Sequence, residues 1–498
     1  MNLETASSIG DSSSDDLVTK VGLALRGNLI VPLWNPFLKD PVDTTAKEFQ
    51  RNDVQWLGKG LQLLMDHVLT VSTEGIILSI TPKAEYDFVA LKQENPSATV
   101  IHLDPHEFLC PGLIDLHIHA PQYSFTGTAT DRPLTGPDGW LETYTFPAEA
   151  RLGQEPHTCK TVYGKLVKQT LAQGTTTAVY FATLDLKPCQ TLVEICQKHG
   201  QRALIGKVCM DRNAPPNYCQ STQQNIDETR ALIDFIYQKA GRRSKSSHKS
   251  PLPLILPLIT PRFIPTCTPS LLSQLGDLAQ EHNCHITSHI SESIDEVAWS
   301  KHLDETEDNG GGRSDAVIFQ QHGLLTDQCI MAHGVHLSET DAALMKEQGS
   351  AVAHCPLSNF FFAGGSLPCR RLLMERGNKV GLGTDVAGGY DSSILHSART
   401  AVLTSLGLEH ASGMSGIHKI DYRHAFYLAT LGGAQALGLE DRIGTLKVGM
   451  EFDAIVLSPS SNVDVFDTDT PADVFQKLVN LGNHQNIKKV FVQGREVK

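Results

Sequence analysis

The chain has 498 residues, 41% of them hydrophobic and 19% charged, and its 42 basic and 55 acidic residues give a formal charge of −13. An acidic balance argues against nucleic acid or an anionic membrane as a partner, because phosphate contacts need surfaces rich in lysine and arginine. No apolar run approaches the roughly 20 residues needed to span a bilayer. The 11 scattered cysteines form no CxxC pair and no signal sequence is evident, so we expect reduced thiols and a cytoplasmic protein.

The sequence pattern predicts short β-strands in two terminal segments. Residues 1–17 are rich in serine and aspartate and are predicted to be a disordered tail. Residues 18–110 contain short β-like runs such as residues 27–33, and residues 445–498 have the same texture. Because neither segment has enough strands to bury a sheet face alone, we predict that together they form one small β-sandwich domain.

The segment between them, residues 111–444, alternates apolar strand-like runs with longer helical patterns. Eight runs read as strands: those beginning at Leu113, Thr176, Ala203, Leu254, Cys284, Cys329, Ala351 and Lys379. Strands that alternate with helices imply a parallel sheet, and eight such units imply a TIM-like (β/α)8 barrel. The predicted fold class is therefore α/β, with a barrel over residues 111–444 and a composite β domain of residues 18–110 and 445–498.

Two polar stretches within the barrel segment are predicted to be surface loops. Residues 241–250 are basic, and residues 305–314 contain three consecutive glycines. The basic stretch is compatible with a nucleic-acid patch, but a solvated loop is favoured because no aromatic residues interleave with the charges. The sequence contains no internal repeat.

A pair of histidines ends the first barrel strand. His117 and His119 follow the apolar run from Leu109 to Leu116. Residues i and i+2 of a strand point to the same face, so the two imidazoles can bind one metal ion, for which zinc and iron are suitable. Taken alone, the pattern is equally compatible with two unrelated histidines on a half-buried strand.

Further polar residues end later strands. His289 closes the fifth strand and can supply a third nitrogen ligand, and Glu292 follows three residues later. A carboxylate there can move protons without binding the metal, although an acid is also typical of a helix start. His333 ends the sixth strand, and Asp385 ends the eighth before the Gly388–Gly389 pair, which would permit a tight turn. Polar groups at four strand ends predict a site on one face of the barrel.

These motifs resemble the amidohydrolase superfamily and, within it, the branch that deaminates guanine. The resemblance covers the barrel from end to end and is carried by seven motifs: PGLIDLHIHAPQY (111–123), WLETYTFPAE (140–149), PRF (261–263), SHISE (288–292), MAHG (331–334), HCPLSN (354–359) and GTDVAGG (383–389). The start of the first motif is typical of the whole superfamily. HIHAPQY, PRF and GTDVAGG together are specific to the guanine branch.

The resemblance implies one zinc ion per subunit, held by four side chains: His117, His119, His289 and Asp385. It implies a catalytic set of Glu292, His333 and Asp385, with Glu292 as the proton shuttle and His333 beside the metal-bound water. It implies a guanine pocket formed by Gln122, Arg262 and Phe263 together with His289, His333 and Asp385. The implied reaction is hydrolytic deamination of guanine to xanthine and ammonia, a step of purine metabolism, by attack of water at C2. A homodimer is also implied.

Several alternatives stay open at this point. Binuclear amidohydrolases have a carbamylated lysine on strand four, and Lys207 lies in a run that is a plausible counterpart of that strand. We interpret Lys207 as structural or pocket-supporting, because the resembled branch uses one metal. Arg262 can read the guanine carbonyl, or it can pair with a nearby acid and only support the barrel rim. The substrate can be another aminated or chlorinated heterocycle, such as cytosine, a triazine or an adenosine derivative. A non-enzymatic scaffold is disfavoured because every ligand and Glu292 are present.

Overall fold

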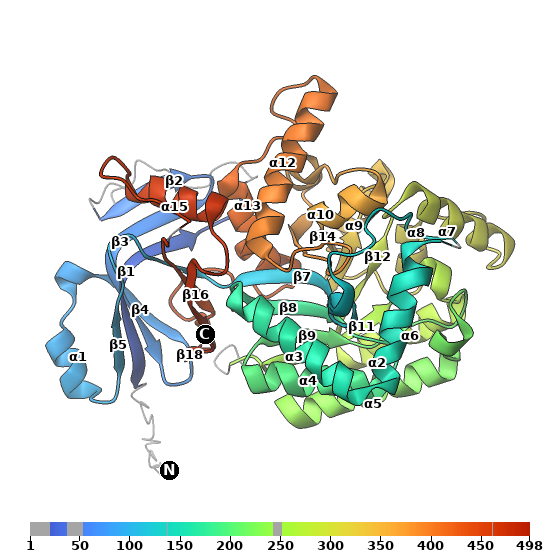
Figure 1. Cartoon of the computed structure of the whole chain (residues 1–498), viewed down its shortest axis with the longest axis horizontal. Helices are drawn as coiled ribbons and strands as arrows, with labels where there is room; N and C mark the ends of the chain where they lie inside the picture. Colours follow the sequence, from blue (N-terminus) through green and yellow to red (C-terminus); the bar gives the residue numbers. More distant parts are fainter. Residues whose placement is uncertain (1–19, 37–52, 137, 243–250, 461) are drawn as a thin grey trace, which may run out of the picture.

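The computed structural model describes residues 20–36, 53–136, 138–242, 251–460 and 462–498. The predicted tail and residues 243–250 of the basic loop lie outside the described residues. The described chain forms a barrel surrounded by helices and, beside it, a smaller β domain that contains both the blue N-terminal strands and the red C-terminal strands (Figure 1). The predicted fold class is confirmed.

The barrel sheet is parallel, and the eight predicted strands all form. They are β7 (Leu113–His119), β8 (Thr175–Phe181), β9 (Arg202–Gly206), β11 (Ile255–Pro261), β12 (His285–Ile290), β13 (Cys329–His333), β14 (Ala351–His354) and β15 (Lys379–Leu382), with a short additional strand β10 (Val208–Cys209) that pairs with β11. Every residue of β8 is buried, as expected for a parallel strand covered on both faces.

The chain just after β15 joins back to β7 and closes the barrel. The backbone N–H of Asp385 donates to the carbonyl oxygen of His117 at 2.8 Å. The backbone N–H of His119 donates to the carbonyl oxygen of Val386 at 3.0 Å. Asp115 strengthens this junction, because its carboxylate accepts from the hydroxyl of Thr384 at 2.5 Å and from the amide of Thr384 at 3.0 Å. The first and last strands therefore place their polar ends side by side.

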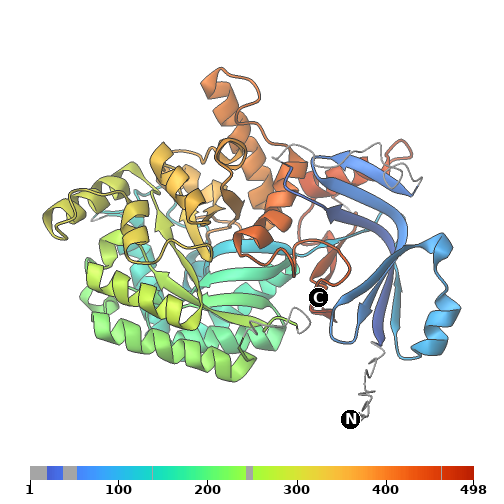
Figure 2. The ribbon, with the colours of Figure 1, turned by 180° about the vertical axis from the view of Figure 1, so that it is seen from behind.

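Helices surround the barrel sheet in both views (Figures 1 and 2). The helices of this part are α2 (Phe146–Gln154), α3 (Pro156–Ala172), α4 (Leu186–His199), α5 (Thr222–Ala240), α6 (Pro269–His282), α7 (Ile294–Thr306), α8 (Asp315–Gln321), α9 (Glu339–Glu347), α10 (Pro356–Ser358), α11 (Cys369–Arg371), α12 (Ile394–Ser412), α13 (Tyr422–Ala429) and α14 (Leu431–Ala436). Their ends follow local sequence rules: α6 begins with the side-chain cap Thr268 and Pro269, and it ends at Asn283 in the left-handed conformation, φ 53°.

The small domain is built from both ends of the described chain. Its strands are β1 (Val21–Pro32), β2 (Val54–Gly58), β3 (Leu61–Ser72), β4 (Ile77–Pro82), β5 (Thr99–His102), β6 (Phe108–Pro111), β16 (Ala454–Leu457), β17 (Ile487–Val492) and β18 (Arg495–Glu496), accompanied by helices α1 (Phe88–Glu94) and α15 (Pro471–Leu481). A bulge between Gly27 and Leu29 lets β1 pair with β5 before it and with β6 after it. The C-terminal strand β16 pairs with β6, so the two sequence segments share one sheet.

A buried ion network joins this sheet to the barrel. Arg202 at the start of β9 is fully buried and donates to Asp453 at 2.7 Å and to Glu451 at 2.8 Å. Arg442 donates to the other oxygen of Glu451 at 2.6 Å. Burial opposes ionisation of Glu451, but the two arginines lower the pKa of this carboxyl below its ordinary value. The interface between the two parts therefore depends on paired charges that cannot be solvated if one partner is removed.

Candidate active site

The predicted site residues converge at the carboxyl ends of the barrel strands. Three residues in or next to this site have positive φ angles: Ser291 at +45°, His333 at +70° and Asp385 at +50°. Non-glycine residues in this left-handed region carry backbone strain, which clusters at functional sites. Gly389 is required for a different reason, since a Cβ atom there would lie 2.0 Å from the carbonyl oxygen of Thr384.

Four predicted metal ligands place their donor atoms within contact of one another. The Nε2 atoms of His119 and His289 are 3.1 Å apart, and Asp385 Oδ1 lies 3.3 Å from Nε2 of His117 and 3.5 Å from that of His119. Ligands about 2.0–2.2 Å from one zinc ion in a tetrahedron are about 3.3–3.6 Å apart. The observed separations therefore fit a single metal ion bound between these side chains. His333 forms a second possible triad with His117 and His289.

The protonation states of the histidines also suit metal binding. His289 Nδ1 lies 2.6 Å from the carbonyl oxygen of Arg262, which can only accept, so Nδ1 carries the proton and Nε2 presents a lone pair. Burial lowers the pKa of His117 and holds the pKa values of His119 and His289 well below the ordinary value. Both ring nitrogens of His117 and Nδ1 of His119 are buried without a hydrogen-bond partner among the described residues. Neutral imidazoles are the form that binds metal ions.

The two carboxylates of the site have opposite pKa shifts. Burial alone would raise the pKa of Asp385, but its contact with His117 and the neighbouring imidazoles hold it well below the usual range. Glu292 is 8% exposed, and burial raises the pKa of its carboxyl above the ordinary value. Asp385 is therefore suited to stay ionised, whereas Glu292 is suited to gain and lose a proton.

His333 lies between these two carboxylates. Its Nδ1 is 2.9 Å from Oδ1 of Asn359, which fixes the proton on Nδ1. Its Nε2 then faces Glu292 at 3.6 Å and Asp385 at 3.9 Å. This arrangement directs Nε2 of the imidazole toward the two carboxylates.

A pocket opens beside these groups. It is lined by His119, Gln122, Leu134, Trp140, Leu141, Arg262, Phe263, His289, Glu292, His333, Ser358, Phe362, Asp385 and Gly388. Every predicted substrate-binding residue lines it, as do Glu292 and the ligand His119. His117 is fully buried behind them. The rings of Trp140 and Phe362, with centroids 4.8 Å apart, form an aromatic wall.

The structure is compatible with both roles that the sequence left open for Arg262, contact with the substrate and pairing with an acid. It lines the pocket, and it also pairs with the buried Glu149 through hydrogen bonds of 2.7 and 3.2 Å. Burial opposes its charge, but Glu149 raises the pKa of the guanidinium. The charge of Arg262 is therefore paired within the protein itself.

Sequence reasoning assigned no role to Glu149, Asp115, Asn359 or Trp140, which support the site. Each lies inside a motif that carries the family resemblance, and this was the available signal. Their contacts could not be derived from spacing, because they bridge elements distant in sequence. The ammonium of Lys207 donates to Gln220 at 2.7 Å and to Asn225 at 3.2 Å, contacts that support the structural interpretation of this residue.

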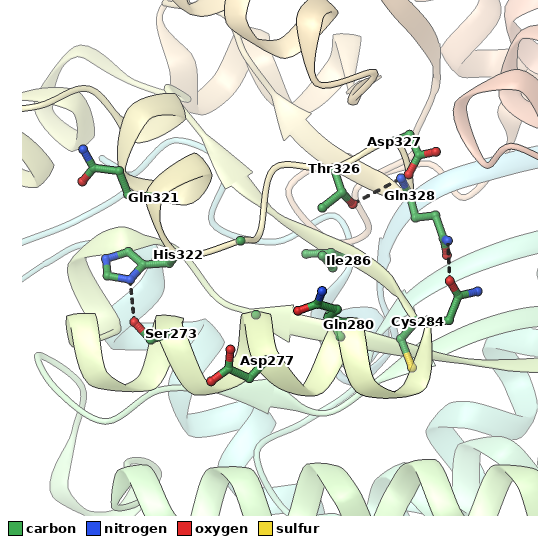
Figure 3. Close-up of a pocket in the computed structure, with 14 residues that line it drawn as sticks. Ser273, Asp277, Gln280, Cys284, Ile286, Gln321, His322, Thr326, Asp327 and Gln328 are labelled. Carbon is green, nitrogen blue, oxygen red and sulfur yellow. Dashed lines mark hydrogen bonds between the residues drawn. The ribbon is translucent and has the colours of Figure 1, made fainter.

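Another pocket, of about 510 Å³, lies at the opposite end of the barrel (Figure 3). It is lined by residues that precede β12 and β13, such as Cys284 and Gln328, and by the helix residues Ser273 and Asp277. Ser273 and His322 form a hydrogen bond of 2.8 Å across it. Barrel enzymes carry out their chemistry at the other face, so this pocket is not part of the candidate site. Within the described residues, no helix is long and apolar enough to cross a membrane.

A barrel whose strand ends bring together histidines and an aspartate with metal-ligand spacing defines a metal-dependent hydrolase. Residues 108–497 match the amidohydrolase family, and the chain belongs to that family. Guanine deaminase of Dictyostelium discoideum is 38% identical over 457 residues, covering 89% of this chain and 95% of the relative. Guanine deaminase of Homo sapiens is 39% identical, covering 88% and 93%. The crystal structure of guanine deaminase from C. acetobutylicum with bound guanine in the active site has a TM-score of 0.79 and 28% identity, covering 96% of this chain and 100% of that chain.

Proposed function

We propose that this hydrolase uses one zinc ion per subunit to deaminate guanine to xanthine and ammonia. The observation that carries the proposal is the convergence of four metal-ligand side chains and Glu292 on one pocket that Gln122, Arg262 and Phe263 also line. The guanine deaminases that match nearly the whole chain support guanine as the substrate. The homodimer and the cytoplasmic location stay predictions.

The metal ligands in this proposal are His117, His119, His289 and Asp385. Their neutral imidazoles, unpartnered ring nitrogens and mutual distances fit a tetrahedral ion. When bound, zinc acts as a Lewis acid that lowers the pKa of a water molecule from about 15.7 to about 7. Asp385 and His333 orient the water, because both face the same side of the pocket, 3.9 Å apart.

Glu292 moves the protons in this mechanism. It takes a proton from the attacking water and delivers it to N3 of guanine, which makes C2 electrophilic. The water oxygen bonds to C2, and Glu292 then carries the second proton to the departing amino group, so that ammonia leaves and xanthine remains. The raised pKa of Glu292 suits this alternation between acid and base.

The pocket residues recognise the purine. Arg262 has five N–H donors, of which Glu149 takes two, so the others are available to the carbonyl at position 6 of guanine. Adenine presents a donor at this position and is disfavoured. Phe263 supplies an apolar face for the ring, and Gln122 reads another edge.

An assay of ammonia release from a panel of nucleobases tests the function. The panel contains guanine, adenine, cytosine and a triazine, each with the protein as purified, after chelation and after reloading with zinc. We expect turnover of guanine, its loss on chelation and its return with zinc. Turnover of another base in preference to guanine would assign a different substrate, and a folded, zinc-loaded protein without any activity would support a scaffold.

A further inference from the structure

Glu149 is a fully buried carboxylate that the proposed reaction does not use. It lies on α2, four residues after the end of the π-helical turn η4 (Leu141–Thr145). Four donors converge on it: Arg262 Nη1 at 2.7 Å, Arg262 Nη2 at 3.2 Å, Gln122 Nε2 at 2.9 Å and the Tyr218 hydroxyl at 2.7 Å. A carboxylate has about four lone-pair positions, so its acceptors are fully used and it cannot also exchange protons with a ligand.

Two of the residues that Glu149 holds line the pocket, whereas Glu149 itself does not. The amide of Gln122 has one possible orientation, because its oxygen accepts from the amide of Ala387 at 3.1 Å while its nitrogen donates to Glu149. The guanidinium of Arg262 is fixed by its two bonds to Glu149 and by the ring of Phe146, whose centroid lies 5.0 Å away. One carboxylate therefore sets the direction in which the remaining N–H groups of both side chains point.

We propose that Glu149 is the positioning residue for carbonyl recognition, holding Arg262 and Gln122 so that their free donors meet the 6-oxo edge of a purine. This inference rests on the proposed function, since it concerns how the same pocket selects its substrate. Replacing Glu149 by glutamine would place an amide donor among four converging donors, so at least one of them must turn away.

Binding of two purines that the enzyme cannot deaminate isolates this role. Hypoxanthine carries the 6-oxo group, purine lacks it, and neither has a 2-amino group. We expect the zinc-loaded wild type to bind hypoxanthine more tightly than purine. In Glu149→Gln we expect hypoxanthine affinity to fall by about 10- to 100-fold, the worth of about one charge-assisted hydrogen bond. We expect purine affinity to change by less than about threefold.

Three further variants make the test specific. Glu149→Asp keeps the charge on a shorter side chain and should restore part of the preference for hypoxanthine. Tyr218→Phe removes one of the donors to Glu149 at a residue that does not line the pocket, and it should lower the preference for hypoxanthine over purine by about threefold. This variant replaces Glu149→Gln if Glu149→Gln does not fold. Glu451→Gln changes another buried acid that is paired with arginines, and it should lower the melting temperature while leaving the preference unchanged.

The outcomes distinguish a failure of the proposed function from a failure of the positioning role of Glu149. If the wild type neither deaminates guanine nor prefers hypoxanthine, the proposed function fails and the inference fails with it. If the wild type does both but the Glu149 and Tyr218 variants lose affinity for hypoxanthine and purine equally, or for neither, the proposed function stands and the positioning role is refuted. In kinetics, the role predicts that KM for guanine rises more than kcat falls.

Discussion

In the proposed zinc site, His117 and His289 each supply one of the four ligands. Removing one imidazole leaves the ion short of a ligand and leaves other buried nitrogens without a partner. We expect His117→Ala and His289→Ala to contain little zinc by elemental analysis and to have negligible turnover. His285→Ala is the control, since His285 lies on β12 like His289 but forms a hydrogen bond of 2.8 Å with the carbonyl oxygen of Leu437. Full zinc occupancy in both ligand variants would refute the assignment.

Glu292 differs from the ligands because its loss should leave the metal in place. Glu292→Gln preserves size but cannot transfer protons, and each general acid–base step contributes about 10²–10⁴-fold. We expect turnover to fall at least about 10³-fold while zinc content and hypoxanthine affinity persist. Rate measurements together with elemental analysis check this. A loss of less than about tenfold would mean that another group carries the protons.

The proposed metal ligands could be predicted because they lie at or just beyond the carboxyl ends of barrel strands, where the period of the sequence gives the direction of a side chain. His119 is the last residue of β7, as expected, whereas Asp385 does not end its strand but follows β15 by three residues. The partner of Arg262 could not be predicted, because Glu149 is separated from it by more than a hundred residues and lies on a helix that carries no spacing signal. Sequence reasoning therefore located the side chains that point into the pocket but not those that hold them in place.

The segment from Trp140 to Glu149 contains a residue that lines the pocket and the carboxylate that holds Arg262. Trp140 is 3% exposed and packs between Phe362 and Phe125, with ring centroids 4.8 and 5.5 Å away. The π-helical turn η4 follows it directly, and such turns are frequent at functional sites. A π-turn is not visible in the sequence, because its residues have the same apolar spacing as an ordinary helix.

Trp140→Ala should weaken substrate binding more than it slows the chemistry. The indole lines the pocket but does not belong to the proposed metal ligands or proton-transfer groups, so its loss should admit water and remove packing against the substrate. We expect KM for guanine to rise by about tenfold or more, with a smaller fall in kcat. Trp140→Phe retains an aromatic wall and should behave nearly as the wild type. Steady-state kinetics with melting temperatures as a folding control decide the matter, and an equal fall of kcat in both variants would contradict a covering role.

At the scale of the whole molecule, the alternation of strands and helices was sufficient to predict the barrel. The eight strands form in the expected order, because a parallel sheet buried on both faces needs continuous apolar runs. The joining of the terminal segments in one sheet was also expected, since neither has enough strands alone. The ion network around Arg202 could not be predicted, because its carboxylates lie about 250 residues away and charged residues are normally expected at the surface.

This network leads us to predict that the C-terminal segment is necessary for folding. Deleting residues 453–498 removes β16 from its place beside β6 and removes Asp453 from Arg202, which is fully buried. An arginine left partly unpaired in the interior costs about 3–5 kcal/mol, a large share of the total stability of a typical domain. We therefore expect the truncated protein to be insoluble or unfolded by circular dichroism and sedimentation. A shorter truncation of residues 495–498, which removes the exposed strand β18 but leaves Asp453, should remain soluble with a modestly lower melting temperature. A soluble and active protein that ends before Asp453 would show that the barrel folds without the composite sheet.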